Sequence, residues 1–125
     1  MPRLTFHVDT IGTTAILRPV GVLDIASAPP LGIQAAELIR RGEQDVVVDL
    51  SAVTFLDSTA LSVLLNITRR ATRAGLGSAI VCPDGRSRLP ITIARLEDTL
   101  RVRESEREAL DCVEDLRRRA RGDAP

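Results

Sequence analysis

The chain has 125 residues, 44% of them apolar and only 2% aromatic, which predicts one domain with a core of Leu, Val, Ile and Ala around two rings, Phe6 and Phe55. Seventeen basic residues, all of them arginine, balance seventeen acidic ones, and this zero net charge argues against a dedicated nucleic-acid binder. Cys82 and Cys112 have no His or Cys companions at metal-ligand spacing, so neither a zinc site nor a disulfide framework is predicted.

Two strands and a helix are expected at the N-terminal end. Leu4–Val8 alternates apolar and polar residues, and Thr14–Val22 is a second apolar stretch, which together predict strands joined by a turn near Asp9–Thr13. Ser27–Pro30 is typical of a helix start, because proline is tolerated in a first turn where its missing N–H has no partner. This helix is expected to end at Gly42.

The centre of the chain predicts an interior strand followed by an amphipathic helix. Asp45–Leu50 contains three consecutive valines without alternation, which is typical of a strand covered on both faces. A helix is expected over about Ser58–Ala74, since apolar residues recur there at i, i+3 and i+4 and arginines precede Gly75.

The C-terminal third continues the alternation of strands and helices. Ser78–Cys82 predicts a short strand, Arg86–Leu96 a third helix, and Leu100–Arg103 an edge strand whose arginines discourage pairing with another sheet. The acidic start of Glu104–Leu116 predicts a last helix. The final residues, Gly122–Pro125, are expected to be disordered.

This order of elements predicts a single α/β domain over residues 1–121. We expect a central mixed sheet of four to five strands packed by about four α-helices. The start of the chain lacks the apolar stretch of a signal peptide, and no run approaches the ~18 apolar residues of a membrane span. The sequence therefore predicts a soluble, cytoplasmic protein without a membrane partner.

The segment that carries most functional information is Asp49–Leu65, D-L-S-A-V-T-F-L-D-S-T-A-L-S-V-L-L, in which the interior strand leads through a short connector into the helix. The connector ends in Asp57, Ser58 and Thr59. Polar side chains at such a junction commonly cap a helix, because an N-cap oxygen accepts a hydrogen bond from the free N–H groups of the first turn. Capping requires only one of the three residues.

This segment resembles the STAS family, the sulphate transporter and anti-sigma factor antagonist domains. The family pattern is an apolar strand, D-L-S-x-V, an apolar pair, then D-S-[ST]-G-L and a helix, and the sequence departs from it at Ala60, where glycine is usual. A second block, G-V-L-D at residues 21–24 followed by Ser27 and Ala28, is similar to the G-x-L-D segment that precedes the first helix of the family. The resemblance extends from about Leu4 to Leu116.

The resemblance implies a partner-switching regulator. Ser58 would be phosphorylated by an ATP-dependent anti-sigma factor kinase, and a phosphatase would restore the free hydroxyl. The unphosphorylated form would bind the anti-sigma factor and free a sigma factor. Thr59 either contacts the partner or caps the helix, and Leu61 either contacts the partner or packs in the core; both alternatives stay open. The expected partner-binding surface consists of Asp24, Asp57, Thr59, Ala60 and Leu61.

Two alternatives to this interpretation are an enzyme and a STAS module with another role. Catalysis is not expected, because Ser58 is outside any G-x-S-x-G and His7 lies on an alternating strand, where a structural histidine is commoner than a catalytic base. No cofactor or metal is predicted. The alternative that stays open is a STAS module with another role, either in a stress-signalling assembly or as the soluble accessory subunit of a membrane transporter.

Overall fold

The computed structural model describes residues 5–42, 44–83, 85–120 and 122. The elements, in chain order, are β1 Thr5–Ile11, β2 Thr14–Leu23, α1 Ala28–Arg41, β3 Asp45–Asp49, β4 Val53–Leu56, α2 Ser58–Arg73, β5 Ser78–Val81, the 3-10 turn η1 Arg86–Arg88, α3 Leu89–Ile93, β6 Val102–Arg103 and α4 Glu106–Ala120. The predicted hairpin, the interior strand and the two long N-terminal helices are confirmed.

The strands form one mixed sheet in the order β1-β2-β3-β5-β6, while β4 pairs with the last residues of β2. β1 is antiparallel to β2, and all other pairs are parallel. Every residue of β3 is buried, as three unbroken valines predict for a strand at the centre of a sheet. The predicted edge position of the last strand is also confirmed, since among the described residues β6 pairs with β5 alone.

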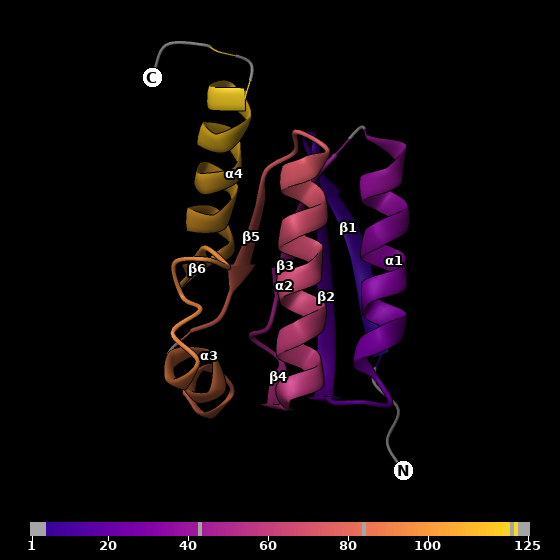
Figure 1. Ribbon diagram of the computed structural model, residues 1–125, viewed down its shortest axis with the longest axis vertical. Helices are drawn as coiled ribbons and strands as arrows, with labels where there is room; N and C mark the ends of the chain where they lie inside the picture. The colour runs from indigo at the N-terminus through magenta and orange to yellow at the C-terminus, as the bar shows by residue number, and fades with distance from the viewer. Residues whose placement is uncertain (1–4, 43, 84, 121, 123–125) are drawn as a thin grey trace.

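Helices cover the two faces of the sheet unequally. Figure 1 shows α1 and α2 side by side over one face and α4 at the left, next to β5. α4 packs against β3 and β5 through a separate core on the other face. The larger core lies under α1 and α2 and includes Leu17, Leu31, Val48 and Leu64, whereas a smaller core under α4 includes Ile16. This two-sided packing confirms the predicted α/β class.

Three details differ from the prediction. The connector between β3 and α2 contains a strand, β4, which raises the strand count to six. The third helix is shorter than Arg86–Leu96, because the ring of Pro90 is accommodated only in a first turn, and so η1 precedes an α-helix that begins at Leu89. Phe55 is not a core ring, since 54% of its surface is exposed.

The ends of the chain lie largely beyond the described residues. Leu4, where the first strand was predicted to begin, is outside them, and so is most of the predicted disordered tail, 123–125. Within the described ranges, no helix combines the length and the hydropathy that crossing a bilayer requires. The same part of the chain contains no group of three or more His, Cys, Asp or Glu residues placed to hold a metal ion.

Candidate functional site

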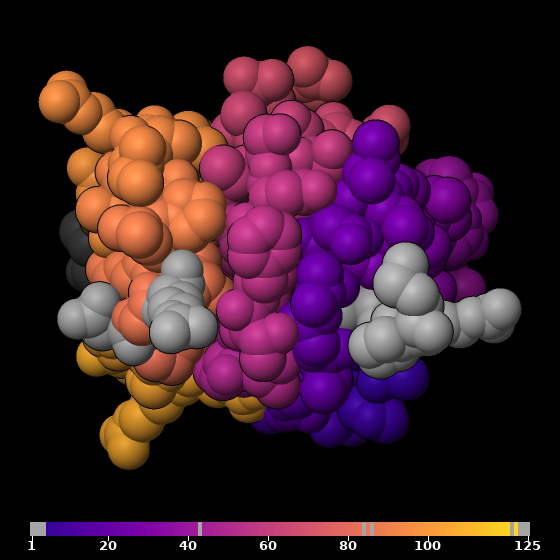
Figure 2. Space-filling view, turned by 90° about the horizontal axis from the view of Figure 1, so that it is seen from below, coloured from indigo at the N-terminus to yellow at the C-terminus, as the bar shows by residue number. Residues whose placement is uncertain are grey.

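The candidate site lies where the parallel strands end. In parallel α/β sheets the loops after the carboxyl ends of the strands commonly carry the binding residues. Here the segment after β2 lies beside β4 and the start of α2, with the η1 and α3 segment on the other side. Figure 2 looks onto this end of the molecule and shows the three segments adjoining one another.

Asp57 fixes the start of α2. Its backbone is extended, and its Oδ1 accepts a hydrogen bond from the N–H of Ala60 at 2.9 Å, which is the geometry of a helix N-cap. Its Oδ2 accepts from the N–H of Ile25 in the loop after β2, at 3.2 Å. One half-buried carboxylate therefore caps the helix and ties it to the neighbouring loop.

Ser58 is the first residue of α2, and its side chain is exposed. Because Asp57 supplies the cap, the hydroxyl of Ser58 is free of that structural duty. Within the described ranges, the N–H groups of Ser58 and the half-buried Thr59 donate to no protein atom, as expected for the first turn of a helix. The site thus combines an accessible hydroxyl with free donors at the positive end of a sixteen-residue helix.

Asp24 lies in the loop that Asp57 binds. Its Oδ1 accepts from the N–H groups of Ala26 at 3.0 Å and Ser27 at 3.1 Å, and these bonds lower the pKa of the Asp24 carboxyl. Since the next residue, Ile25, bonds to Asp57, the loop brings Asp24 and the start of α2 together. The surface around Ser58 therefore already carries two carboxylates.

Ala60 and Leu61 turn toward the interior. Ala60 has no exposed surface and belongs to the larger core, and Leu61 is partly buried against the same core. The methyl of Ala60, which stands where the family pattern has glycine, therefore lies beneath the predicted surface. Any contribution of these two residues to binding is expected to come mainly from packing that supports the helix start.

Two apolar side chains at this end were not predicted as part of the site. Ile25 is 73% exposed, and Phe55 is 54% exposed and pairs across β4 and β2 with Val22. Exposed large apolar groups beside a polar centre are typical of protein-binding surfaces. The sequence could not place Phe55 on the surface, because an aromatic residue three positions before a helix is equally compatible with a core position. Its only distinguishing feature in the sequence was that aromatic residues are rare in this chain.

A pair of carboxyl groups, Asp49 and Glu106, lies where β3 ends and α4 begins. Asp49, the first residue of the D-L-S motif, is nearly buried; its Oδ1 accepts from the N–H of Ser51 at 2.9 Å, and the carboxyl also bonds to Glu106. Burial and Glu106 raise the pKa of Asp49. Arg18 binds Glu106 through two nitrogens, at 2.7 and 2.9 Å, and lowers the pKa of Glu106 to about 2, with a further contribution from Asp49. In this pair the protonated form is therefore favoured at Asp49 and the ionised form at Glu106.

Asp49→Asn is expected to make stability less dependent on pH. A carboxyl whose folded-state pKa is raised stabilises the fold at low pH, and this contribution is lost as pH rises through the raised pKa. Asparagine can donate to Glu106 without ionising, so the variant should gain up to about 1 kcal/mol over wild type at pH 8 relative to a pH below 3.8, where the Asp49 carboxyl is mostly protonated in the unfolded chain as well. Urea unfolding at both pH values measures this, with exposed Asp111→Asn as control. If the variant and wild type differed in unfolding free energy by the same amount at both pH values, the raised pKa of Asp49 would be contradicted.

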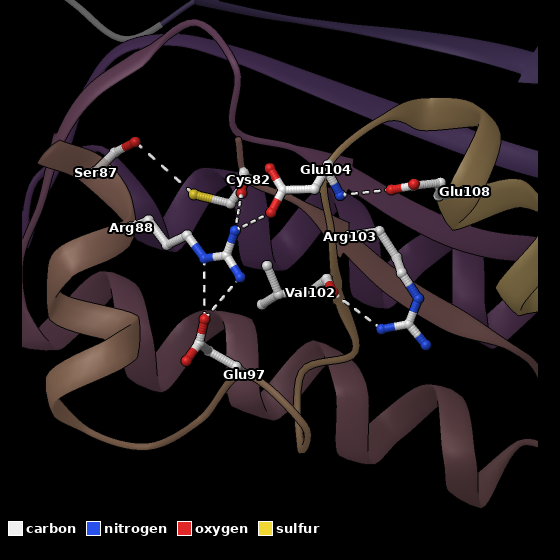
Figure 3. Close-up of polar contacts among 8 residues, drawn as sticks. All are labelled: Cys82, Ser87, Arg88, Glu97, Val102, Arg103, Glu104 and Glu108. Carbon is white, nitrogen blue, oxygen red and sulfur yellow. Dashed lines mark hydrogen bonds and ion pairs between the residues drawn. The ribbon is translucent and has the colours of Figure 1, made fainter. Parts of the chain in front are cut away.

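An ion-pair network holds the η1 and α3 segment next to the site. The guanidinium of Arg88 donates to Glu97 at 2.7 and 3.0 Å, binds Glu104, and reaches the carbonyl of Cys82 at 3.5 Å, as Figure 3 shows. Burial raises the pKa of the Cys82 thiol, so this cysteine is neutral at physiological pH. The network ties a short helix with two exposed apolar residues, Leu89 and Ile93, to the ends of β5 and β6.

The family model for the STAS domain matches residues 5–109. The chain belongs to the STAS family. This confirms the resemblance drawn from the D-L-S and D-S-T-A-L motifs. A search of curated proteins found no match.

Solved structures with this STAS fold include anti-sigma factor antagonists. A crystal structure of one from Mycobacterium paratuberculosis is 26% identical, with a TM-score of 0.80 over 90% of this chain and 95% of that one. SpoIIAA, another anti-sigma factor antagonist, was solved unphosphorylated, at 15% identity, and phosphorylated, from Bacillus, at 18%. Both forms give a TM-score of 0.67, covering 90% and 86% of this chain and 98% and 97% of SpoIIAA.

The fold also occurs inside a larger protein. The murine anion transporter Slc26a9 contains a matching region, at 15% identity and a TM-score of 0.64, which covers 86% of this chain and 18% of the transporter. At this identity the likeness concerns the fold alone. The STAS domain described here is therefore similar in structure to anti-sigma factor antagonists, with the candidate site at the start of α2.

Proposed function

We propose that this STAS domain is an anti-sigma factor antagonist controlled by phosphorylation of Ser58. The unphosphorylated protein binds an anti-sigma factor, which is a serine kinase, in the cytoplasm. The kinase transfers the γ-phosphoryl group of ATP to the Ser58 hydroxyl and the complex then separates, until a phosphatase removes the phosphate. The protein acts by binding and has no catalytic role of its own.

The observation that carries this proposal is the exposed hydroxyl of Ser58 beside an N-cap that another residue provides. A phosphate there could accept hydrogen bonds from the free N–H groups of Ser58 and Thr59 and would be favoured by the helix dipole. The fold can therefore accept the modification without unfolding. The two phosphorylation states in which SpoIIAA was solved support the same conclusion for a protein of this fold.

Phosphorylation would act on the surface and not on the core. A phosphate adds about −1.5 to −2 charge units at pH 7, next to Asp57 and the loop of Asp24. A partner that packs over Ile25 and Phe55 would have to desolvate this charge. Burying an unpaired charge at an interface costs about 2–5 kcal/mol, which corresponds to a change in affinity of roughly thirty-fold or more.

The proposal is tested by following the complex through the cycle. Purified protein is mixed with the anti-sigma factor from the same genome and run on a size-exclusion column with ADP, with ATP, and with ATP followed by a serine phosphatase. We expect a complex with ADP, separation with ATP, and recovery after phosphatase treatment. A complex that persists unchanged through all three conditions, or that never forms, would refute the proposal.

Ala60→Gly should restore the residue usual in the family without changing partner binding. The methyl of Ala60 is buried, so its loss affects the helix and the core beneath the surface. We expect a loss of about 1 kcal/mol in unfolding free energy, because glycine is a poorer helix former than alanine. Affinity for the anti-sigma factor should stay within about twofold. A change of more than fivefold would mean that the methyl bears on the partner.

A further inference from the structure

The second half of α2 carries a concentration of positive charge that the proposed function does not use. Arg69, Arg70 and Arg73 are exposed on this helix, and none of its sixteen residues is acidic. The last turn of α1 adds Arg40 and Arg41. Although the whole chain has a net charge of zero, this end of the two-helix face is basic.

The arginines of α2 form no ion pairs in the part of the chain that the structure describes, although Glu37 and Asp98 lie in the same hollows. Glu37 on α1 pairs with Arg40 at 2.7 Å and Arg41 at 3.7 Å. Within the described ranges, Arg69, Arg70 and Arg73 make no ion pair with any carboxylate. Their charge is therefore available to a partner.

These side chains line two hollows on either side of α2. An open groove of about 620 Å³ lies between α1 and α2 and is lined by Arg40, Arg70 and Arg73 together with Ile33, which is 71% exposed. A second hollow of about 420 Å³, on the side of β6, is lined by Arg69, Arg73 and Arg101, and also by Asp98. Figure 1 shows α1 and α2 side by side, and the residues that line the groove come from the C-terminal parts of both helices.

We infer that the groove between α1 and α2 binds an acidic helical segment of a partner protein. Arg70 and Arg73 are three positions apart, and side chains at this spacing on a helix are about 5–6 Å apart. Carboxylates three or four positions apart on another helix have the same spacing, which allows paired charge-assisted hydrogen bonds. The exposed side chain of Ile33 offers an apolar contact in the same groove.

The lining of the groove favours this partner over a nucleic acid or a membrane. No aromatic residue lines the groove, so unpaired bases would find no ring on which to stack. The carboxylate of Glu37 also lies in the groove but is paired with the two arginines of α1, which leaves Arg70 and Arg73 for the partner's carboxylates. A bilayer would require a broad apolar face, whereas Ile33 is the only exposed large apolar residue among the groove's lining residues.

The groove is separate from the Ser58 site. Arg73 lies fifteen positions after Ser58 on α2, which corresponds to about 22 Å along the helix axis. An anti-sigma factor at one end and an acidic segment at the other could therefore bind together. A negative result for the groove does not affect the proposal for Ser58, and the reverse also holds, so the two proposals are tested independently.

The test uses a fluorescein-labelled, alanine-based helical peptide of 18 residues with glutamate at every third or fourth position, and a copy with glutamine in place of glutamate. Fluorescence anisotropy is measured at about 50 mM salt, where surface charges are weakly screened. We expect the full-length protein to bind the glutamate peptide at least tenfold more tightly than the glutamine copy. The double variant Arg70→Gln/Arg73→Gln should lose at least tenfold in affinity.

A matched control separates the groove from general charge effects. Arg107→Gln/Arg118→Gln removes two exposed arginines from α4 and should change affinity less than twofold. Equal losses in the two double variants would overturn the proposal. So would tighter binding of a 16-base-pair DNA duplex or of phosphatidylglycerol vesicles at the same salt concentration. Self-association that Arg70→Gln/Arg73→Gln abolishes would assign the groove to a second copy of the chain and would also overturn it.

Discussion

Ser58→Asp is expected to weaken binding to the anti-sigma factor by roughly thirty-fold or more, whereas Ser58→Ala keeps the affinity of the unmodified protein. The hydroxyl is exposed and serves no capping role, so its removal adds no charge to the surface and leaves the cap of α2 in place. A carboxylate at the same place must be desolvated next to Asp57 when a partner docks. Isothermal titration calorimetry with the anti-sigma factor measures the difference.

Two controls make this comparison specific. Ser62 is exposed one turn further along α2, and Ser62→Asp adds the same charge to the same helix; we expect less than a threefold loss of affinity. Ser58→Asp should also leave unfolding free energy within about 1 kcal/mol of wild type, because an anion in a first helical turn is favourable. Equal affinities of the alanine and aspartate variants at position 58 would refute the switch.

Asp57→Ala is expected to lower the unfolding free energy by about 2 kcal/mol. The change removes the N-cap of α2, which contributes about 1 kcal/mol, and the bond to the Ile25 N–H, which contributes a similar amount. The loop that carries Asp24 then loses its tie to the helix. Urea unfolding followed by circular dichroism measures this loss.

Asp57→Asn is the matched variant for this prediction. Asparagine is an equally good N-cap and keeps one acceptor for the Ala60 N–H, so it should lose less than half as much stability as alanine. Affinity for the anti-sigma factor should follow the same order, since the side chain of Asp57 holds both the start of α2 and the loop that carries Asp24. Identical stabilities of the alanine and asparagine variants would show that capping by Asp57 does not hold the site together.

Most of the architecture could be predicted from the sequence because its elements follow strong local patterns. The unbroken valines of β3 and the apolar stripe of α2 leave few alternatives. β4 was missed because its four residues gain their strand conformation from pairing with β2, which no local pattern reveals. The third helix was predicted too long, since Pro90 is compatible with a helix only near its first turn.

The candidate site could be predicted in part. Its sequence motif placed Ser58 at a helix start, but only the hydrogen bonds show that Asp57 is the cap and that Ser58 is free of that role. The positions of Ile25 and Phe55 on the surface depend on which face of a loop or strand is left uncovered, and this is a tertiary property. The groove of α1 and α2 arises in the same way, from two arginine-rich helix ends that lie far apart in the sequence.

The measurement that tests the central claim most directly is localisation of the phosphate. The protein is incubated with the anti-sigma factor kinase and ATP, and the modified residue is identified by mass spectrometry in wild type and in Ser58→Ala. We predict a single phosphate on Ser58 in wild type and none in the variant. A phosphate on Thr59 or Ser62, or undiminished labelling of Ser58→Ala, would contradict the assignment.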